Sequence, residues 1–137
     1  MSGNKLCIPL TDWQKMQKHA ASIAPQEACG LLAGKDCRVS KCFAIENELH
    51  SPTRFRMEAQ SQLNAFLLIE KLGIDLLAYY HSHPLGGGEP SAIDIAEFLY
   101  PDVIMLIWFQ QDGIWQAKGW NIQDSAFSPV ILEIVES

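Results

Sequence analysis

Residues 79–98 are the feature that most constrains how this chain can fold. They begin at the end of an apolar run, cross a loop with three consecutive glycines between two prolines, and enter a segment with helical spacing. Residues 76–80 are apolar at both alternating positions, which predicts a strand buried on both faces. His81 and His83 come next, and side chains two residues apart on a strand point to the same side. Two imidazoles are therefore expected together at the end of a buried strand.

A carboxylate joins these histidines if the glycine-rich loop folds back. Asp94 stands in the first turn of the helix predicted after the loop. Two imidazoles and one carboxylate would leave a fourth position on a tetrahedral metal for water, as in a catalytic zinc site. Simpler explanations are open, because Ser91 and Asp94 also form a capping box without any metal. The whole spacing, His-x-His-Pro-x6-Ser-x2-Asp, is more than a capping box requires and favours the metal site.

This spacing resembles the motif of the JAMM, or MPN+, metallopeptidase family, in which a distant glutamate precedes His-Ser-His-Pro-x6-Ser-x2-Asp. The second part of the motif is complete here, in His81, Ser82, His83, Pro84, Ser91 and Asp94. The family glutamate lies in a Glu-x-Cys-Gly-Leu-Leu-x-Gly stretch on a neighbouring strand. Residues 27–34 match it as Glu-Ala-Cys-Gly-Leu-Leu-Ala-Gly. The resemblance covers nearly the whole chain.

The resemblance implies a role for each motif residue. One zinc ion per chain would be held by His81, His83 and Asp94. Glu27 would act as general base and acid, and the Ser91 hydroxyl would stabilise the developing oxyanion. Composition alone would make Glu27 a solvated residue at the start of a strand, because most glutamates are exposed.

The resemblance also implies an activity and a partner. The expected function is a zinc-dependent peptidase that hydrolyses an amide or isopeptide bond after the C-terminal Gly-Gly of a ubiquitin-like protein of the sulfur-carrier type. A non-catalytic scaffold of the same fold is the competing hypothesis, although inactive relatives characteristically lose motif ligands and this chain keeps them. The His-Glu-x-x-His motif of zincins is absent, and so is the Pro-Cys-x-x-Cys motif of zinc deaminases.

Length and charge set the outer bounds. With 137 residues, 48% of them apolar and 19% charged, the chain is expected to form one soluble domain over residues 1–137. A net charge of −6 without a lysine or arginine cluster argues against nucleic acid as a partner. The longest apolar run, residues 103–109, is far below the ~20 residues that span a bilayer. No membrane association and no secretory signal are expected, so a cytoplasmic location is the default, and homo-oligomerisation is left open.

Two further candidates for chemistry are expected to be inert. The four cysteines lack a Cys-x2-Cys pair and are interpreted as reduced thiols, and Cys29 is expected to pack in the core although it lies two residues after Glu27. Glu89 in the glycine-rich loop is a rival carboxylate without support from the motif. We expect it to be solvated.

The remaining pattern predicts a single α/β domain with a mixed, curved sheet flanked by helices. The resemblance implies the same fold, in a cytidine-deaminase-like arrangement. A first helix is expected to begin at a capping box of Thr11 and Gln14, with His19 exposed beside its apolar face. The other predicted elements are strands at 28–33, 39–45, 103–109, 114–120 and 130–135, and helices at 58–72 and 91–99, the last stopped by Pro101.

Overall fold

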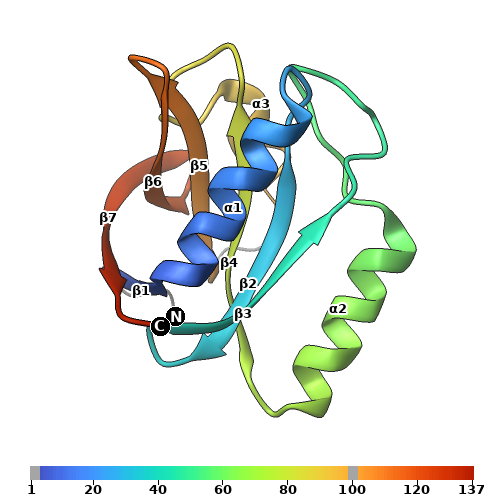
Figure 1. Cartoon of the computed structure of the whole chain (residues 1–137), viewed down its shortest axis with the longest axis vertical. Coiled ribbons are helices and arrows are strands. Elements are labelled where there is room, and N and C mark those ends of the chain that lie inside the picture. The colour runs from blue at the N-terminus through green and yellow to red at the C-terminus, as the bar shows by residue number, and fades with distance from the viewer. Residues whose placement is uncertain (1–3, 99–101) are drawn as a thin grey trace.

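The computed structural model describes residues 4–98 and 102–137, in which seven strands form one closed, curved sheet (Figure 1). The strands are β1 (Lys5–Pro9), β2 (Cys29–Lys35), β3 (Arg38–Ile45), β4 (Asp75–His83), β5 (Ile104–Gln111), β6 (Ile114–Gln123) and β7 (Ala126–Val135). The helices are α1 (Leu10–Ile23), α2 (Ala59–Lys71) and α3 (Ala92–Ala96). The strand order is β1-β3-β2-β4-β5-β6-β7, with β7 returning to β1. This confirms the predicted α/β fold, whereas closure of the sheet was not predicted.

Strand β4 lies in the middle of the sheet and carries the two histidines. It pairs antiparallel with β2, with Cys29 opposite His81, and parallel with β5, with Ile107 opposite His81. Of the apolar run, residues 78–80 are buried as predicted and Leu76 and Leu77 are half-buried, and burial continues to residue 82. Pairing along both edges fixes the register of β4 and therefore the position of its last residues relative to β2 and β5.

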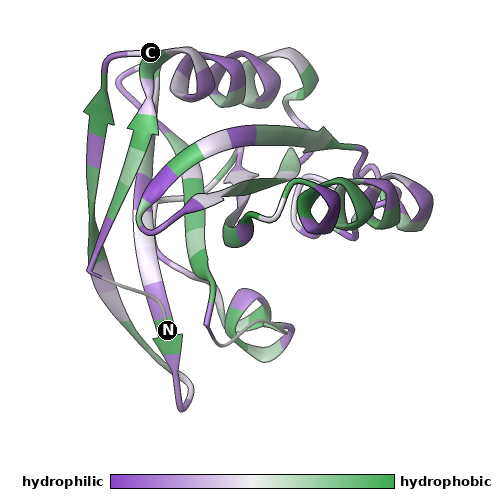
Figure 2. Cartoon of the chain, turned by 90° about the horizontal axis from the view of Figure 1, so that it is seen from below, coloured by the Kyte–Doolittle hydropathy of each residue, from purple (hydrophilic) through white to green (hydrophobic). Residues whose placement is uncertain are grey.

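Hydrophobic side chains pack on both faces of the sheet. On one face, Met16 and Ala20 of α1 are buried, and the Trp13 ring lies 4.6 Å from that of Trp108. On the other face, Ala65 and Ile69 of α2 are buried. Green, hydrophobic segments follow the strands in Figure 2, and the long helices alternate between green and purple. The predicted amphipathic helices therefore cover the sheet from two sides. No helix in the described ranges is long and apolar enough to cross a membrane.

Local turn chemistry explains the element boundaries. The carboxylate of Glu58 caps α2 by accepting hydrogen bonds from the backbone N–H groups of Gln60 and Ser61. Gly73 follows α2 with a φ of 67°, the left-handed conformation that glycine adopts readily at a helix end. Asp112 and Gly113, with φ of 54° and 77°, join β5 to β6. The predicted second helix and hairpin are confirmed.

The structure corrects the predicted ends of two helices. Helix α1 begins at Leu10, directly after Pro9 at the end of β1, so Thr11 is not a capping residue. The backbone N–H of Thr11 donates to the Ser137 hydroxyl instead. Helix α3 ends at Ala96, earlier than predicted, and the predicted stop at Pro101 lies outside the described residues.

His19 is half-buried rather than exposed. Its Nδ1 lies 2.7 Å from the hydroxyl oxygen of Tyr80, a β4 residue that packs on the α1 face of the sheet. Burial, helped by the charge of Lys15, lowers the pKa of His19. The neutral ring accepts the Tyr80 hydrogen bond when its proton is on Nε2.

We expect His19 to make stability depend on pH. Its pKa is lower in the folded chain than the value of about 6.5 in the unfolded chain, so the unfolded chain binds the proton more readily. Stability should therefore fall as pH drops below about 6.5, and His19→Gln should reduce that fall. Thermal unfolding of chelator-treated protein at pH 7.5 and 5.5 measures this without a contribution from metal loss. Equal falls in wild type and variant would contradict the assignment.

Candidate metal centre

His81 and His83 lie together at the end of β4. The Nε2 atoms of the two rings are 3.1 Å apart, as the alternation of side chains along a strand requires. The His81 side chain is fully buried, and that of His83 is 11% exposed. One imidazole is therefore sealed from solvent, while the other lies at the rim.

Asp94 completes the group from the first turn of α3. Its Oδ1 lies 3.2 Å from Nε2 of His81, and its Oδ2 lies 2.9 Å from Nε2 of His83. The Ser91 N–H donates to Asp94 Oδ2 at 2.9 Å, and the Asp94 N–H donates to the Ser91 hydroxyl at 3.0 Å. The capping box thus holds the carboxylate that faces the histidines, so the capping box does not exclude the metal site that the spacing predicts.

The electrostatics of the group suit a cation. Burial alone would raise the pKa of Asp94, but hydrogen bonds from both histidines hold that pKa well below its usual value. Burial lowers the pKa of His81. For His83 burial acts in the same direction, but hydrogen bonds with Asp94 and Gly87 outweigh it and raise the pKa. Asp94 is therefore an anion beside two imidazoles.

The hydrogen bond of His83 directs a lone pair into the group. Its Nδ1 lies 2.7 Å from the Gly87 carbonyl oxygen, which can only accept, so Nδ1 carries a proton. In the neutral ring, Nε2 then presents a lone pair toward His81 and Asp94. Nε2 of His83 can therefore donate to Asp94 only when the ring is protonated, and in the neutral ring its lone pair is available to a cation. The ligand atoms lie within 4.8 Å of one another, so the group could hold a metal ion.

The glycine-rich loop is anchored beside His83. The Trp120 indole N–H donates to the Gly88 carbonyl at 2.7 Å. A Cβ at Gly88 would lie 2.6 Å from the Phe109 ring, so glycine is required there. Two hydrogen bonds to adjacent carbonyl groups therefore hold the loop. His83 donates to the Gly87 carbonyl, and Trp120 donates to the Gly88 carbonyl.

Glu27 lies just before β2 and is 3% exposed. Its Oε1 is buried and has no hydrogen-bond partner among residues 4–98 and 102–137. Burial raises the pKa of Glu27 to about 8, opposed by the charge of His83 and assisted by that of Asp94. The buried carboxyl group of Glu27 thus interacts electrostatically with His83 and Asp94.

The two serines of the motif lie in different environments. Ser91 is exposed at the start of α3, and its hydroxyl oxygen accepts from Asp94, which leaves the hydroxyl proton available for donation. Ser82 is fully buried, and its hydroxyl accepts from the Ala28 N–H at 2.7 Å. Ser82 therefore joins β4 to the residue after Glu27.

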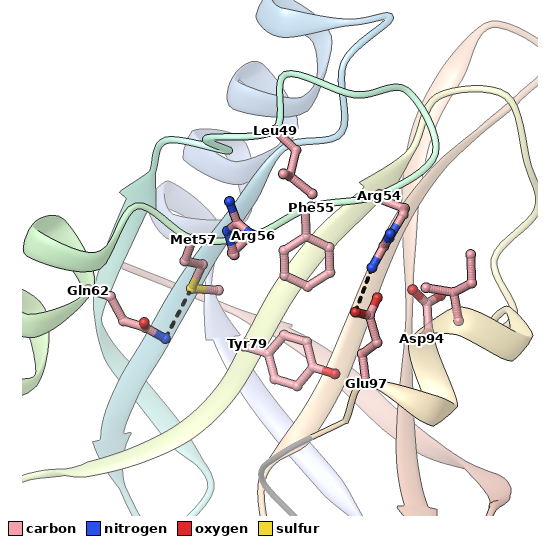
Figure 3. Close-up of a pocket in the computed structure, with 10 residues that line it drawn as sticks. Leu49, Arg54, Phe55, Arg56, Met57, Gln62, Tyr79, Asp94 and Glu97 are labelled. Atoms are coloured by element: carbon pink, nitrogen blue, oxygen red, sulfur yellow. Dashed lines mark hydrogen bonds and ion pairs between the residues drawn. The ribbon is translucent and has the colours of Figure 1, made fainter.

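An apolar cleft of about 290 Å³ opens beside the group (Figure 3). Its lining residues are Leu49, Arg54, Phe55, Arg56, Met57, Gln62, Tyr79, Ile93, Asp94 and Glu97. The Phe55 ring stacks on His81 with centroids 4.7 Å apart, and Arg54 forms a 2.8 Å ion pair with Glu97. The cleft therefore runs from β4, which carries the two histidines, to α3, which carries Asp94.

Sequence reasoning did not identify the cleft. Residues 46–56 form a polar stretch without clear periodicity, and such a stretch predicts only a loop. Asn47 is 2% exposed, although no motif in the surrounding polar stretch predicts its burial. The signal that was available is one aromatic residue in an otherwise polar segment, which is too weak to predict a binding surface.

The two rejected candidates lie where the sequence analysis expected. Cys29 is fully buried, and burial raises the pKa of its thiol to about 12, so the thiol is a poor nucleophile. Glu89 is exposed in the glycine-rich loop. The carboxyl group that interacts electrostatically with His83 and Asp94 is that of Glu27.

Comparison with known proteins identifies the family. Residues 11–123 match the family model described as prokaryotic homologs of the JAB domain. The chain belongs to this family. The match confirms the predicted resemblance to JAMM proteins.

Curated relatives extend over most of this JAB-domain chain. A desampylase of Haloferax volcanii is 33% identical over 105 residues, which cover 74% of this chain and 75% of the relative. A probable TtuB-protein conjugate cleaving protease of Thermus thermophilus is 33% identical over 113 residues, 82% of this chain and 74% of the relative. A CysO-cysteine peptidase of Mycobacterium tuberculosis is 28% identical over 124 residues, 88% and 85% of the two chains.

Solved structures share the fold. A solution structure of a protein from Desulfitobacterium hafniense has a TM-score of 0.86 at 28% identity and covers 96% of this chain and 94% of its own. A crystal structure of a JAB1/MPN domain protein from Archaeoglobus fulgidus has a TM-score of 0.64 at 20% identity, over 96% and 100% of the two chains. The JAB-type fold therefore extends across the chain.

We expect purified protein to contain about one divalent metal ion per chain, because its ligand atoms converge on one point. His83→Ala or Asp94→Ala removes a ligand and should strip most of the metal. His50→Ala is the matched control, since His50 lies in an exposed loop and contacts Gln26. Elemental analysis of protein prepared without chelators measures the content. Equal metal in the wild type and all variants would contradict the assignment.

Proposed function

We propose that this protein is a zinc-dependent metallopeptidase that cleaves conjugates of a ubiquitin-like, sulfur-carrier-type protein after the C-terminal Gly-Gly. The observation that carries the proposal is the buried carboxyl group of Glu27, whose Oε1 has no hydrogen-bond partner in the described residues, beside the group of His81, His83 and Asp94. Two nitrogen ligands and one oxygen ligand suit tetrahedral zinc with an open fourth position. The site then has both a place for a metal and a base beside it.

Glu27 is the proposed general base and acid. Bound zinc would lower the pKa of a water molecule and polarise the scissile carbonyl. Glu27 takes one proton from the attacking water and returns it to the leaving amine, so the water oxygen is added to the acyl carbon and the C–N bond breaks. Burial raises the pKa of Glu27 to about 8 in the metal-free chain, whereas a nearby cation favours its carboxylate form. A bound cation would therefore lower this pKa and favour the carboxylate form, which a general base needs.

Ser91 is the proposed oxyanion donor. Its hydroxyl oxygen accepts the Asp94 N–H, so its proton can be donated to the oxygen of the scissile carbonyl. Charge develops on that oxygen only in the transition state, and a fixed donor stabilises it there. Because the capping box fixes Ser91 relative to Asp94, donor and metal ligand move as one unit.

The substrate assignment rests on the names of the relatives and on the cleft. The relatives are named for cleavage of TtuB conjugates, for desampylation and for cleavage of CysO-cysteine. The cleft beside His81 can take an extended tail, and narrow glycine residues let the scissile bond approach the metal. We assign the affinity mainly to the folded ubiquitin-like body.

We also propose that residues 1–137 act as one domain. The family match begins at residue 11 and ends at residue 123. Outside it, β1 and β7 pair with each other over five residues, from Lys5 with Ile131 to Pro9 with Val135. Both segments are therefore integral to the closed sheet.

Glu27→Gln separates chemistry from metal binding. The amide keeps the shape of the side chain but cannot take a proton, so turnover should fall at least ~10²-fold while bound zinc is retained. Glu89→Gln is the matched control, because Glu89 is an exposed carboxylate of the nearby loop. Initial cleavage rates and zinc content are measured on the same preparations. Unchanged turnover in Glu27→Gln would move the base elsewhere, and a wild type that binds the partner without cleaving it would favour the scaffold hypothesis.

The tail specificity is tested with three substrates. These are a sulfur-carrier-type protein extended past Gly-Gly, the same protein with Val-Val in place of Gly-Gly, and the free tail peptide. Only the first should be cleaved efficiently, because bulky residues keep the backbone from the metal and the peptide lacks the folded body. Mass spectrometry identifies the products. Efficient cleavage of the Val-Val protein or of unrelated unfolded peptides would indicate a general peptidase.

A further inference from the structure

The backbone of Glu27 is held by a loop rather than by the sheet. Its N–H donates to the Ser51 carbonyl at 2.8 Å, and its carbonyl accepts from the Asn47 side chain at 3.1 Å. The next residue, Ala28, is held by Ser82 of β4 through both its N–H and its carbonyl. The position of the Glu27 carboxyl group therefore depends on residues 46–57, which connect β3 to α2.

Asn47 uses its full hydrogen-bonding capacity at this point. Its Nδ2 donates to the carbonyls of Glu27 at 3.1 Å and Arg54 at 3.0 Å. Its Oδ1 accepts from the backbone N–H groups of Leu49 and Arg56, each at 3.1 Å. Two donors and two lone pairs are all that an asparagine side chain offers. The side chain is 2% exposed, and all its hydrogen-bonding groups are paired. It joins the backbone of Glu27 to the 46–57 loop.

The loop residues that Asn47 holds form one wall of the cleft. Arg54 and Arg56, both bonded to Asn47, flank Phe55. The Phe55 ring lines the cleft and stacks on His81. The Nδ1 atom of His81 is buried and has no hydrogen-bond partner in the described parts of the chain, so packing against Phe55 contributes to the orientation of the ring. One side chain thus connects the backbone of the base to the wall that contacts a ligand ring.

We propose that Asn47 is a positioning residue that holds Glu27 and the Phe55 wall of the cleft in one arrangement. The inference rests on the proposed function and deepens it, because it joins proton transfer and tail binding through one buried amide. Fixed placement of a base matters because a displacement of about 1 Å can cost ~10²-fold in rate. Asn47 contacts neither substrate nor metal and acts through the main chain of Glu27 and the loop.

Asn47→Asp is the sharpest test. Aspartate has nearly the same shape and can accept from Leu49 and Arg56, but as a carboxylate it cannot donate to Glu27 and Arg54. We expect kcat to fall about 10- to 100-fold, the range seen when supporting partners of a site are lost, with a smaller rise in KM for the ubiquitin-like substrate. Zinc content should stay near one per chain, because the ligands are untouched. Asn47→Ala should behave similarly, and Asn47→Asp carries the test if the alanine variant does not fold.

Val39→Ala controls for general destabilisation. Val39 is fully buried and pairs with Gly34 at the turn end of the β2–β3 hairpin, away from the end that follows Glu27. Below its unfolding transition, this variant should have lower thermal stability but the same kcat and KM as the wild type. If the Asn47 variants lose no more kcat than Val39→Ala at matched stability, a purely structural role is indicated and the proposal is overturned.

Hydrogen exchange tests the proposal without activity. In Asn47→Asp, the amides of Glu27 and the 46–57 loop should exchange faster, while those of β4 and α1 remain as in the wild type. Unchanged exchange at Glu27 would refute the positioning role even if cleavage is slow. Failure of wild-type protein to cleave any conjugate would refute the proposed function, and the exchange result would still decide whether Asn47 holds Glu27.

Discussion

The site depends on β4 being held in register along both of its edges. Antiparallel pairing with β2 places Cys29 opposite His81, and parallel pairing with β5 places Ile107 there. A shift by one residue would turn both imidazoles to the opposite face of the sheet, toward α1. Because His81 is completely buried, little freedom remains to correct such a shift. The closed sheet therefore acts as the rigid support on which the ligand geometry is built.

Burial and charge oppose each other at this site, and each side chain shows a different balance. Asp94 stays ionised although burial disfavours its charge, because two imidazoles and a backbone N–H donate to it. Within residues 4–98 and 102–137, no group donates to Oε1 of Glu27, so burial dominates and raises its pKa to about 8. The same kind of side chain is thereby suited to binding a cation at one position and to moving a proton at the other.

Much of the fold could be predicted from local patterns. The hairpin at Asp112 and Gly113, the end of α2 at Gly73, and the buried strand before His81 depend on residues near one another in sequence. Thr11 was misassigned because its pattern fits a capping box, whereas β1 runs directly into α1 through Pro9. Closure of the sheet between β1 and β7 could not be predicted, since it pairs segments more than a hundred residues apart.

The sequence by itself predicted the grouping of His81, His83 and Asp94, because the side-chain period of a strand puts the two histidines on one side and the whole spacing through Asp94 matches the family motif. It also pointed to Glu27, through the residues that follow it. Only the tertiary structure decided that Glu27 is buried, that Asn47 holds its backbone, and that Phe55 forms a cleft wall against His81. Burial and these contacts arise from non-local packing of the 46–57 loop onto β2 and β4, for which no local pattern of residues codes.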